Sequence, residues 1–156
     1  MRATLDIETA LFNILEADGH SASAHAIPAS LGATLPHIHI VRTGGSNSDM
    51  VIDIHNVDFD VYAADQADAM TTASNLCAWI RSLAGNTTGV PCYTSEIVTL
   101  PYPNPDPLHP TLARATVKAQ IRTRTMEDTS QAEEFAILSS PDDVILTDQF
   151  EVLSGE

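Results

Sequence analysis

Apolar residues near the N-terminus recur at the spacing of an amphipathic helix, which predicts a helix over residues 4–17. Thr4 is the expected N-cap, acidic residues follow in the first turn, and Gly19 supplies a stop signal. The apolar stripe of this helix consists of Leu5, Leu11, Phe12, Ile14 and Leu15. Residues 20–36 are rich in small side chains and contain two prolines, so we expect at most a short strand there.

Alternation of apolar and polar residues predicts a strand over residues 37–42. Its isoleucines face one side, and His37 and His39 face the other, so the strand should be half-buried. The glycine-rich residues 44–49 that follow predict a flexible loop.

A second alternating strand is expected over residues 50–63, and its pattern changes phase part of the way along. The apolar residues occupy even positions at first and odd positions from Val57 onward. Because one regular strand cannot hold both sets on one face, the pattern predicts a bulge or break near His55 and Asn56.

The rest of the pattern predicts one more helix and two more strands. Asp65 has the properties of an N-cap, Asp68 lies in the first turn, and Gly85 follows the expected end of the helix. The strands are expected over residues 92–100 and 111–125, joined by a proline-rich loop.

Charge divides the chain into two parts. The formal net charge is −14, from 21 acidic and 7 basic residues. All the basic residues precede Met126, whereas residues 127–156 hold nine acidic residues and no basic one. We therefore expect a domain over residues 1–126 and an acidic C-terminal extension over residues 127–156.

The acidity and the hydropathy exclude several classes of protein. A net negative charge disfavours wrapping nucleic acid, which needs clustered lysine and arginine, but it suits a surface that DNA passes without binding. A role in solubility alone is the simpler alternative. No apolar stretch approaches the ~20 residues that cross a bilayer, and acids near the N-terminus do not fit a signal peptide. We expect no membrane association and a cytoplasmic site of synthesis, where Cys77 and Cys92 stay as buried free thiols.

Three histidines are the only candidates for metal chemistry. His37 and His39 share a strand face, and His55 could lie on a neighbouring strand, so the three could hold zinc with one open position. The acids available to support such a site are Asp53, Asp58 and Asp60. The chain lacks a metalloprotease helix motif and paired cysteines, so exposed histidines are the preferred interpretation. We expect no catalytic residue, metal or cofactor.

The last predicted strand carries a stripe of basic residues on the face opposite its apolar side: Arg114, Lys118, Arg122 and Arg124. This basic stripe could grip DNA or an acidic protein, or could simply discourage sheet aggregation. We prefer a further possibility, in which the acidic extension of one copy pairs with the stripe of a neighbouring copy.

The order of these segments resembles the tail terminator (tail completion) proteins of long-tailed phages, especially those of actinobacterial phages. The resemblance covers roughly residues 5–125. Its most specific pieces are Arg42-Thr43-Gly44-Gly45, the strand Asp58–Ala63 and Pro105-Asp106-Pro107. The chain departs from the family pattern at Tyr62, where tryptophan is common, and in its acidic extension.

The resemblance implies an α+β fold, a twisted, mostly antiparallel or mixed sheet of about four strands flanked by two main helices. It further implies a non-catalytic virion protein, assembled in the host cytoplasm. Six copies would form a ring that caps the tail tube, stops its polymerisation and docks the head–tail connector, while genomic DNA passes through the lumen. The expected partners are further copies, the major tail tube protein and the connector or stopper protein. The residues expected at the assembly interface are Arg42, Gly44, Gly45, Asp49, Asp106, Arg114, Lys118, Arg122 and Arg124.

Other functions stay open. The nearest alternatives are a head–tail stopper, another ring protein of the neck or the tube subunit. Tube subunits need a long hairpin, which the sequence pattern does not predict. Two different classes are a small histidine-dependent metalloenzyme and an acidic interaction protein that mimics DNA.

Overall fold

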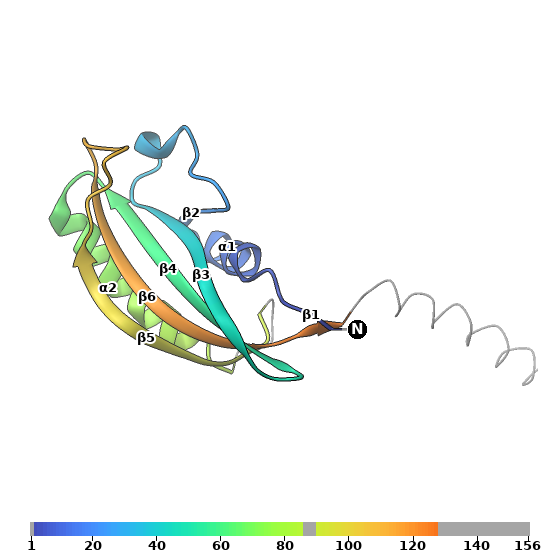
Figure 1. Cartoon of the computed structure of the whole chain (residues 1–156). Coiled ribbons are helices and arrows are strands. Elements are labelled where there is room, and N and C mark those ends of the chain that lie inside the picture. The colour runs from blue at the N-terminus through green and yellow to red at the C-terminus, as the bar shows by residue number, and fades with distance from the viewer. Residues whose placement is uncertain (1, 86–89, 128–156) are drawn as a thin grey trace, which may run out of the picture. The chain divides into compact units, whose positions relative to one another are not determined.

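The computed structural model describes residues 2–85 and 90–127, and it confirms the α+β fold. Residues 4–125 contain a five-stranded mixed sheet in the order β2-β3-β4-β6-β5, with the helices packed against it (Figure 1). Only β2 and β3 run parallel; every other neighbouring pair in this sheet is antiparallel. The strands of this sheet are β2 (Ser21–Ala24), β3 (His37–Asp49), β4 (Ile52–Ala63), β5 (Cys92–Pro103) and β6 (Ala113–Arg124), and the helices are α1 (Ile7–Ala17), η1 (Leu31–Ala33) and α2 (Gln66–Ser82).

A separate two-residue ribbon pairs β1 (Arg2–Ala3) with β7 (Met126–Glu127). The acidic extension lies outside the described residues from position 128 onward. The expected domain boundary and the role of that extension therefore stay predictions. None of the described helices is long and apolar enough to cross a membrane.

Helix α1 begins later than the sequence pattern suggests. Asp6, not Thr4, is its N-cap, because the Asp6 Oδ1 atom accepts the Thr9 backbone N–H at 3.3 Å. The expected cap at Thr4 is wrong. At the start of α2 the expectation is confirmed: Asp65 Oδ1 accepts the Asp68 N–H at 2.8 Å.

One apolar core fills the space between the sheet and both helices. Figure 1 shows α2 behind β4, β6 and β5, and α1 beside β2 and β3. Helix residues such as Leu11 and Ile80 share this core with Ile40, Phe59 and Val117 from three strands of the sheet. Burial of this apolar surface is the main stabilising contribution. Both cysteines are buried and free, as expected.

Strand β3 extends beyond the segment that the sequence pattern predicts. It continues through Gly44 and Gly45 to Asp49, so residues 44–49 pair with β4 and the expected flexible loop is wrong. Together β3 and β4 form a long hairpin, a feature that the sequence pattern does not predict.

The irregularity expected near His55 and Asn56 lies on the neighbouring strand. Strand β4 pairs with β6 without interruption, whereas β3 shifts register between Arg42 and Gly44, opposite Asn56. The phase change in β4 has another cause: Asp53 and His55 take positions on the buried face. Their burial is partly compensated by hydrogen bonds, from Asn47 Nδ2 to Asp53 Oδ1 at 2.8 Å and between His55 Nε2 and the Thr123 hydroxyl at 2.9 Å. Asp53 Oδ2 and His55 Nδ1 are buried without a hydrogen-bond partner.

Candidate functional site

The residues expected at the assembly interface are spread along the sheet, and most of them lie towards one end. Six of them lie at the end where the β3–β4 hairpin turns, which we call the hairpin end: Arg42, Gly44, Gly45, Asp49, Arg122 and Arg124. Residues 42–50 are all exposed although 42–49 belong to strand β3, and Met50 at the turn is 86% exposed. Asp106, Arg114 and Lys118 lie elsewhere and are described below.

Local geometry explains two of the residues at the hairpin end. Gly45 approaches β4 so closely that a Cβ atom there would collide with the backbone carbonyl oxygen of Ile54. Asp49 Oδ1 accepts the backbone N–H groups of Val51 at 2.8 Å and Ile52 at 3.0 Å, which closes the turn. Both residues therefore shape the hairpin.

Strand β6 adds two cations to the hairpin end. Arg122 pairs with Ile54 and Arg124 with Ile52 in the sheet register, and both arginine side chains are exposed. They lie on the face of the sheet that points away from the apolar core. This end of the sheet thus combines an exposed strand with two exposed arginine side chains, and both are available to a partner.

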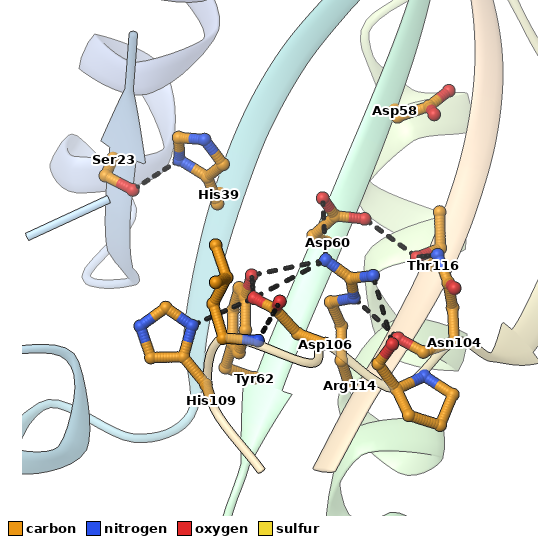
Figure 2. A network of polar contacts seen from close by, with 12 residues as sticks. Ser23, His39, Asp58, Asp60, Tyr62, Asn104, Asp106, His109, Arg114 and Thr116 are labelled. Carbon is orange, nitrogen blue, oxygen red and sulfur yellow. Dashed lines mark hydrogen bonds and ion pairs between the residues drawn. The ribbon is translucent and has the colours of Figure 1, made fainter. Parts of the chain in front are cut away.

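At the opposite end, a polar network attaches the loop 104–112 to the sheet. Asp106 Oδ2 accepts the Tyr62 hydroxyl at 2.8 Å, contacts His109 Nδ1 at 2.9 Å, and lies 3.7 Å from an Arg114 nitrogen (Figure 2). Asp106 Oδ1 accepts the Leu108 N–H at 3.0 Å. The Asp106 carboxylate therefore joins β4, β6 and its own loop.

The same network continues along the polar face of the sheet. Thr116 donates to Asp60 at 2.7 Å and accepts from Asn104 at 3.1 Å. Arg114 also donates to the Asn104 carbonyl and lies 4.0 Å from Asp60. Further along, Lys118 Nζ donates to Asp58 Oδ2 at 3.0 Å, and Figure 2 shows Asp58 apart from the cluster around Arg114.

Burial and charge shift the pKa values in this network in opposite directions. Burial raises the pKa of Tyr62 to about 12, so its hydroxyl stays protonated and donates. Burial also opposes ionisation of Asp106. The hydrogen bonds from His109, Leu108 and Tyr62, together with the Arg114 charge, outweigh that effect and hold the Asp106 pKa at about 2.

The predicted basic stripe is thus half neutralised within its own chain. Arg114 faces Asp60 and Asp106, and Lys118 faces Asp58, so these two cations already have carboxylate partners. Only Arg122 and Arg124 of the stripe remain exposed at the hairpin end. A partner that is recognised through the whole stripe would have to displace these internal carboxylates.

The expectation of exposed histidines is wrong. His37 and His39 are buried, because each lies beside a serine of the parallel strand β2. His37 Nδ1 contacts the Ser21 hydroxyl at 2.8 Å, and His39 Nδ1 contacts the Ser23 hydroxyl at 2.7 Å. Burial lowers the pKa of all three candidate histidines, which favours their neutral forms.

The structure does not bring the three histidines together. His39 pairs with Asp60 on the polar face of the sheet, whereas His55 lies on the face that carries the apolar core. In the described part of the chain, no group of three His, Cys, Asp or Glu residues is placed to hold a metal ion.

Several members of the polar network were missed at the level of sequence. Tyr62, Asn104, His109 and Thr116 have no local motif, and their partners lie up to 56 residues away. One signal was available: acids at positions 58 and 60, on one face of a strand, complement bases at positions 114 and 118, on one face of another. Opposite charges on facing strands indicate pairing.

Comparison with protein-family models and with curated proteins finds no match for this chain.

Proposed function

We propose that this chain is a structural subunit of a phage tail, a tail terminator that forms a ring, with six copies as the expected number. The hairpin end carries the proposal, because residues 42–50, one arm of the hairpin and its turn, are all exposed and two exposed arginines lie beside them on β6. An exposed strand at the edge of a sheet is suited to contact another protein. The α+β fold is also the one that the family resemblance implies.

In this role the ring caps the tail tube, stops its polymerisation and offers a surface to the head–tail connector. The major tail tube protein and the connector or stopper protein are the proposed partners, and the virion is the proposed location. Genomic DNA would pass through the lumen without specific binding. The net charge of −14 and the carboxylates that neutralise Arg114 and Lys118 support weak attraction to phosphate.

The metalloenzyme alternative receives less support. Its three histidines lie on two faces of the sheet and contact serine or threonine hydroxyl groups. Each of these buried histidines has at least one hydroxyl partner within its own chain, although His55 Nδ1 has no hydrogen-bond partner.

A tube subunit is the second candidate, and the long β3–β4 hairpin favours it. Tube subunits need such a hairpin, and the structure contains one over residues 37–63. The two candidates differ in assembly: a terminator stops at one ring, whereas a tube subunit adds ring upon ring.

The mass of the assembled species, measured with and without tail tubes, tests the proposal. A terminator should form one ring, with a mass about six times the 16.7 kDa of the chain, and should cap tubes at a defined length. Open-ended tubes formed by this chain alone would identify a tube subunit. A monomer or dimer that leaves tube length unchanged would contradict both and favour an acidic interaction protein.

A matched pair of charge reversals locates the contact. Reversal of the exposed cations, Arg122→Glu with Arg124→Glu, should disturb capping or head joining, whereas Arg81→Glu on the exposed surface of α2 should not. Arg114 is unsuitable for this test because it holds the internal network together. Unchanged tail length and head joining in the double variant would count against the hairpin end as the contact.

A further inference from the structure

The sheet has two open edges. Among the strands that the structure describes, β5 is the last on one side and pairs with β6 alone. On the other side, β2 covers β3 only from His37 to Ile40. Within residues 2–85 and 90–127, no strand pairs with the outer side of β3 from Gly44 onward. Unpaired backbone groups at such edges are a template for another strand.

The two open edges lie in the same rows of the sheet. One row runs Ser46–Ile54–Arg122–Thr94 and the next runs Gly45–His55–Ile121–Ser95. When copies are related by rotation about an axis parallel to the strands, equivalent rows of neighbouring copies lie at the same level along that axis. The open part of β3 in one copy would therefore meet residues 93–96 of β5 in the next. Cys92 is not available, because its backbone C=O accepts the Gly85 N–H at 2.9 Å and its own N–H donates to the Val90 carbonyl at 2.8 Å.

The other half of β5 is unsuited to pairing. In the rows that β2 covers, β5 carries Pro101 and Pro103, and Pro103 lies in the row of Ile38. Proline has no backbone N–H and blocks a sheet edge. The half of β5 that can pair with another strand therefore lies in the same rows of the sheet as the uncovered part of β3.

Side chains at these edges favour contact between copies. Tyr93 and Val98 of β5 are 50% and 62% exposed, which is unusual for large apolar residues and leaves apolar surface for a partner to bury. Residues 43–48 carry no charge, and residues 92–98 carry only Glu96. In a chain with a net charge of −14, these edges can approach with little like-charge repulsion.

We infer that β5 of one copy pairs antiparallel with the hairpin end of β3 in a second copy, with Thr94 opposite Ser46. The contact joins two different edges, so its repetition by rotation can close a ring. The inference rests on the proposed ring and adds the surfaces through which its copies meet.

Cysteine cross-linking of the full chain tests this pairing. Thr94 and Ser46 are both exposed, and within one chain three strand spacings, about 14 Å, separate them. A disulfide needs Cα atoms within about 7 Å, so a bond between these positions must join two copies. The variants Thr94→Cys and Ser46→Cys are mixed at the concentration of the mass measurement, with oxidised glutathione as the oxidant.

The mixture should give a covalent dimer of the two variants, and the double variant should give a ladder of larger species. Neither single variant nor the unaltered chain should cross-link, because Cys77 and Cys92 are only 4% exposed. A matched control mixes Ser46→Cys with Thr71→Cys on the exposed side of α2 and should give no dimer.

The other outcomes separate this inference from the proposed function. A dimer of Thr94→Cys alone would show pairing of two identical edges and would overturn the inference. Rings that form without any cross-link would also overturn it and leave the ring proposal standing. A monomer in every mass measurement, with and without tail tubes, would contradict both.

Discussion

Asp106 shows how one side chain organises its surroundings. It is buried and ionised, and three hydrogen bonds and the Arg114 guanidinium surround it. A buried carboxylate is stable only with such partners, because burial alone would neutralise it. The role of Asp106 is to attach the loop 104–112 to β4 and β6. In the sequence, only its place between Pro105 and Pro107 drew attention to this residue.

Replacing Asp106 by asparagine should make stability depend less on pH. The Asp106 pKa is about 2 in the folded protein and higher in the unfolded chain, so its ionised form stabilises the fold above about pH 4. We expect Asp106→Asn to lose roughly 1–3 kcal/mol of unfolding free energy at pH 7. The difference from the unaltered chain should shrink as the pH falls from about 4 towards 2. Urea unfolding over that range measures it, and a difference that is independent of pH would contradict this account.

At the scale of elements, the β3–β4 hairpin distinguishes this fold from its expected form. The sequence pattern ends the first strand near residue 42, because glycine and serine normally terminate strands. In the structure the pairing continues to Asp49, since β4 is held in register by β6 along its whole length. Pairing with an already ordered neighbour outweighs weak local propensity.

Gly45→Ala should destabilise the hairpin. A Cβ atom at this position would collide with the Ile54 carbonyl oxygen, which is backbone and cannot move aside. We expect a loss of about 1–3 kcal/mol in unfolding free energy and faster hydrogen exchange in residues 44–54. Gly32→Ala is the matched control, because open space surrounds that glycine and its stability should change by less than about 0.5 kcal/mol. Equal effects of the two substitutions would refute the steric argument.

At the scale of the whole molecule, charge sets the conditions for assembly. The chain is strongly acidic, two of its cations are neutralised internally, and the open sheet edges are almost uncharged. Copies can therefore meet in two ways. In one, the open sheet edges of two copies pair. In the other, the acidic extension of one copy binds the exposed Arg122 and Arg124 of another. The two contacts respond oppositely to salt.

Raising the salt concentration should strengthen assembly if the sheet edges carry it. From about 0.1 M to about 1 M NaCl the Debye length falls from about 10 Å to about 3 Å, which screens repulsion between acidic copies. Sedimentation should then show a larger assembled fraction at high salt. Weaker assembly at high salt would favour the contact between the extension and the arginines, and deleting residues 128–156 should then abolish both the assembly and its salt dependence.

The local features of the fold were largely predictable from the sequence. Both helices, the strands around residues 38, 58, 96 and 118, and the cap at Asp65 follow from signals within a few residues of each other. Most of the errors have a common cause. The exposed histidines, the break at His55 and the missing long hairpin depend on contacts with distant segments, such as β2 beside His37 and Thr123 beside His55. The cap at Thr4 is a local error, since Asp6 caps α1 through the Thr9 N–H.

The sequence by itself determined the α+β alternation of elements, the acidic balance and the confinement of basic residues to the part before Met126, because periodicity, capping and charge are properties of near neighbours. Only the tertiary structure decided which charged side chains bind a partner within the chain and which stay exposed for contact with another protein. Lys118 meets Asp58 across 60 positions, and Arg122 meets no carboxylate among the described residues although it lies four residues further along the same strand. Strand order and register place such groups, and both are set by packing between segments that lie far apart in the chain.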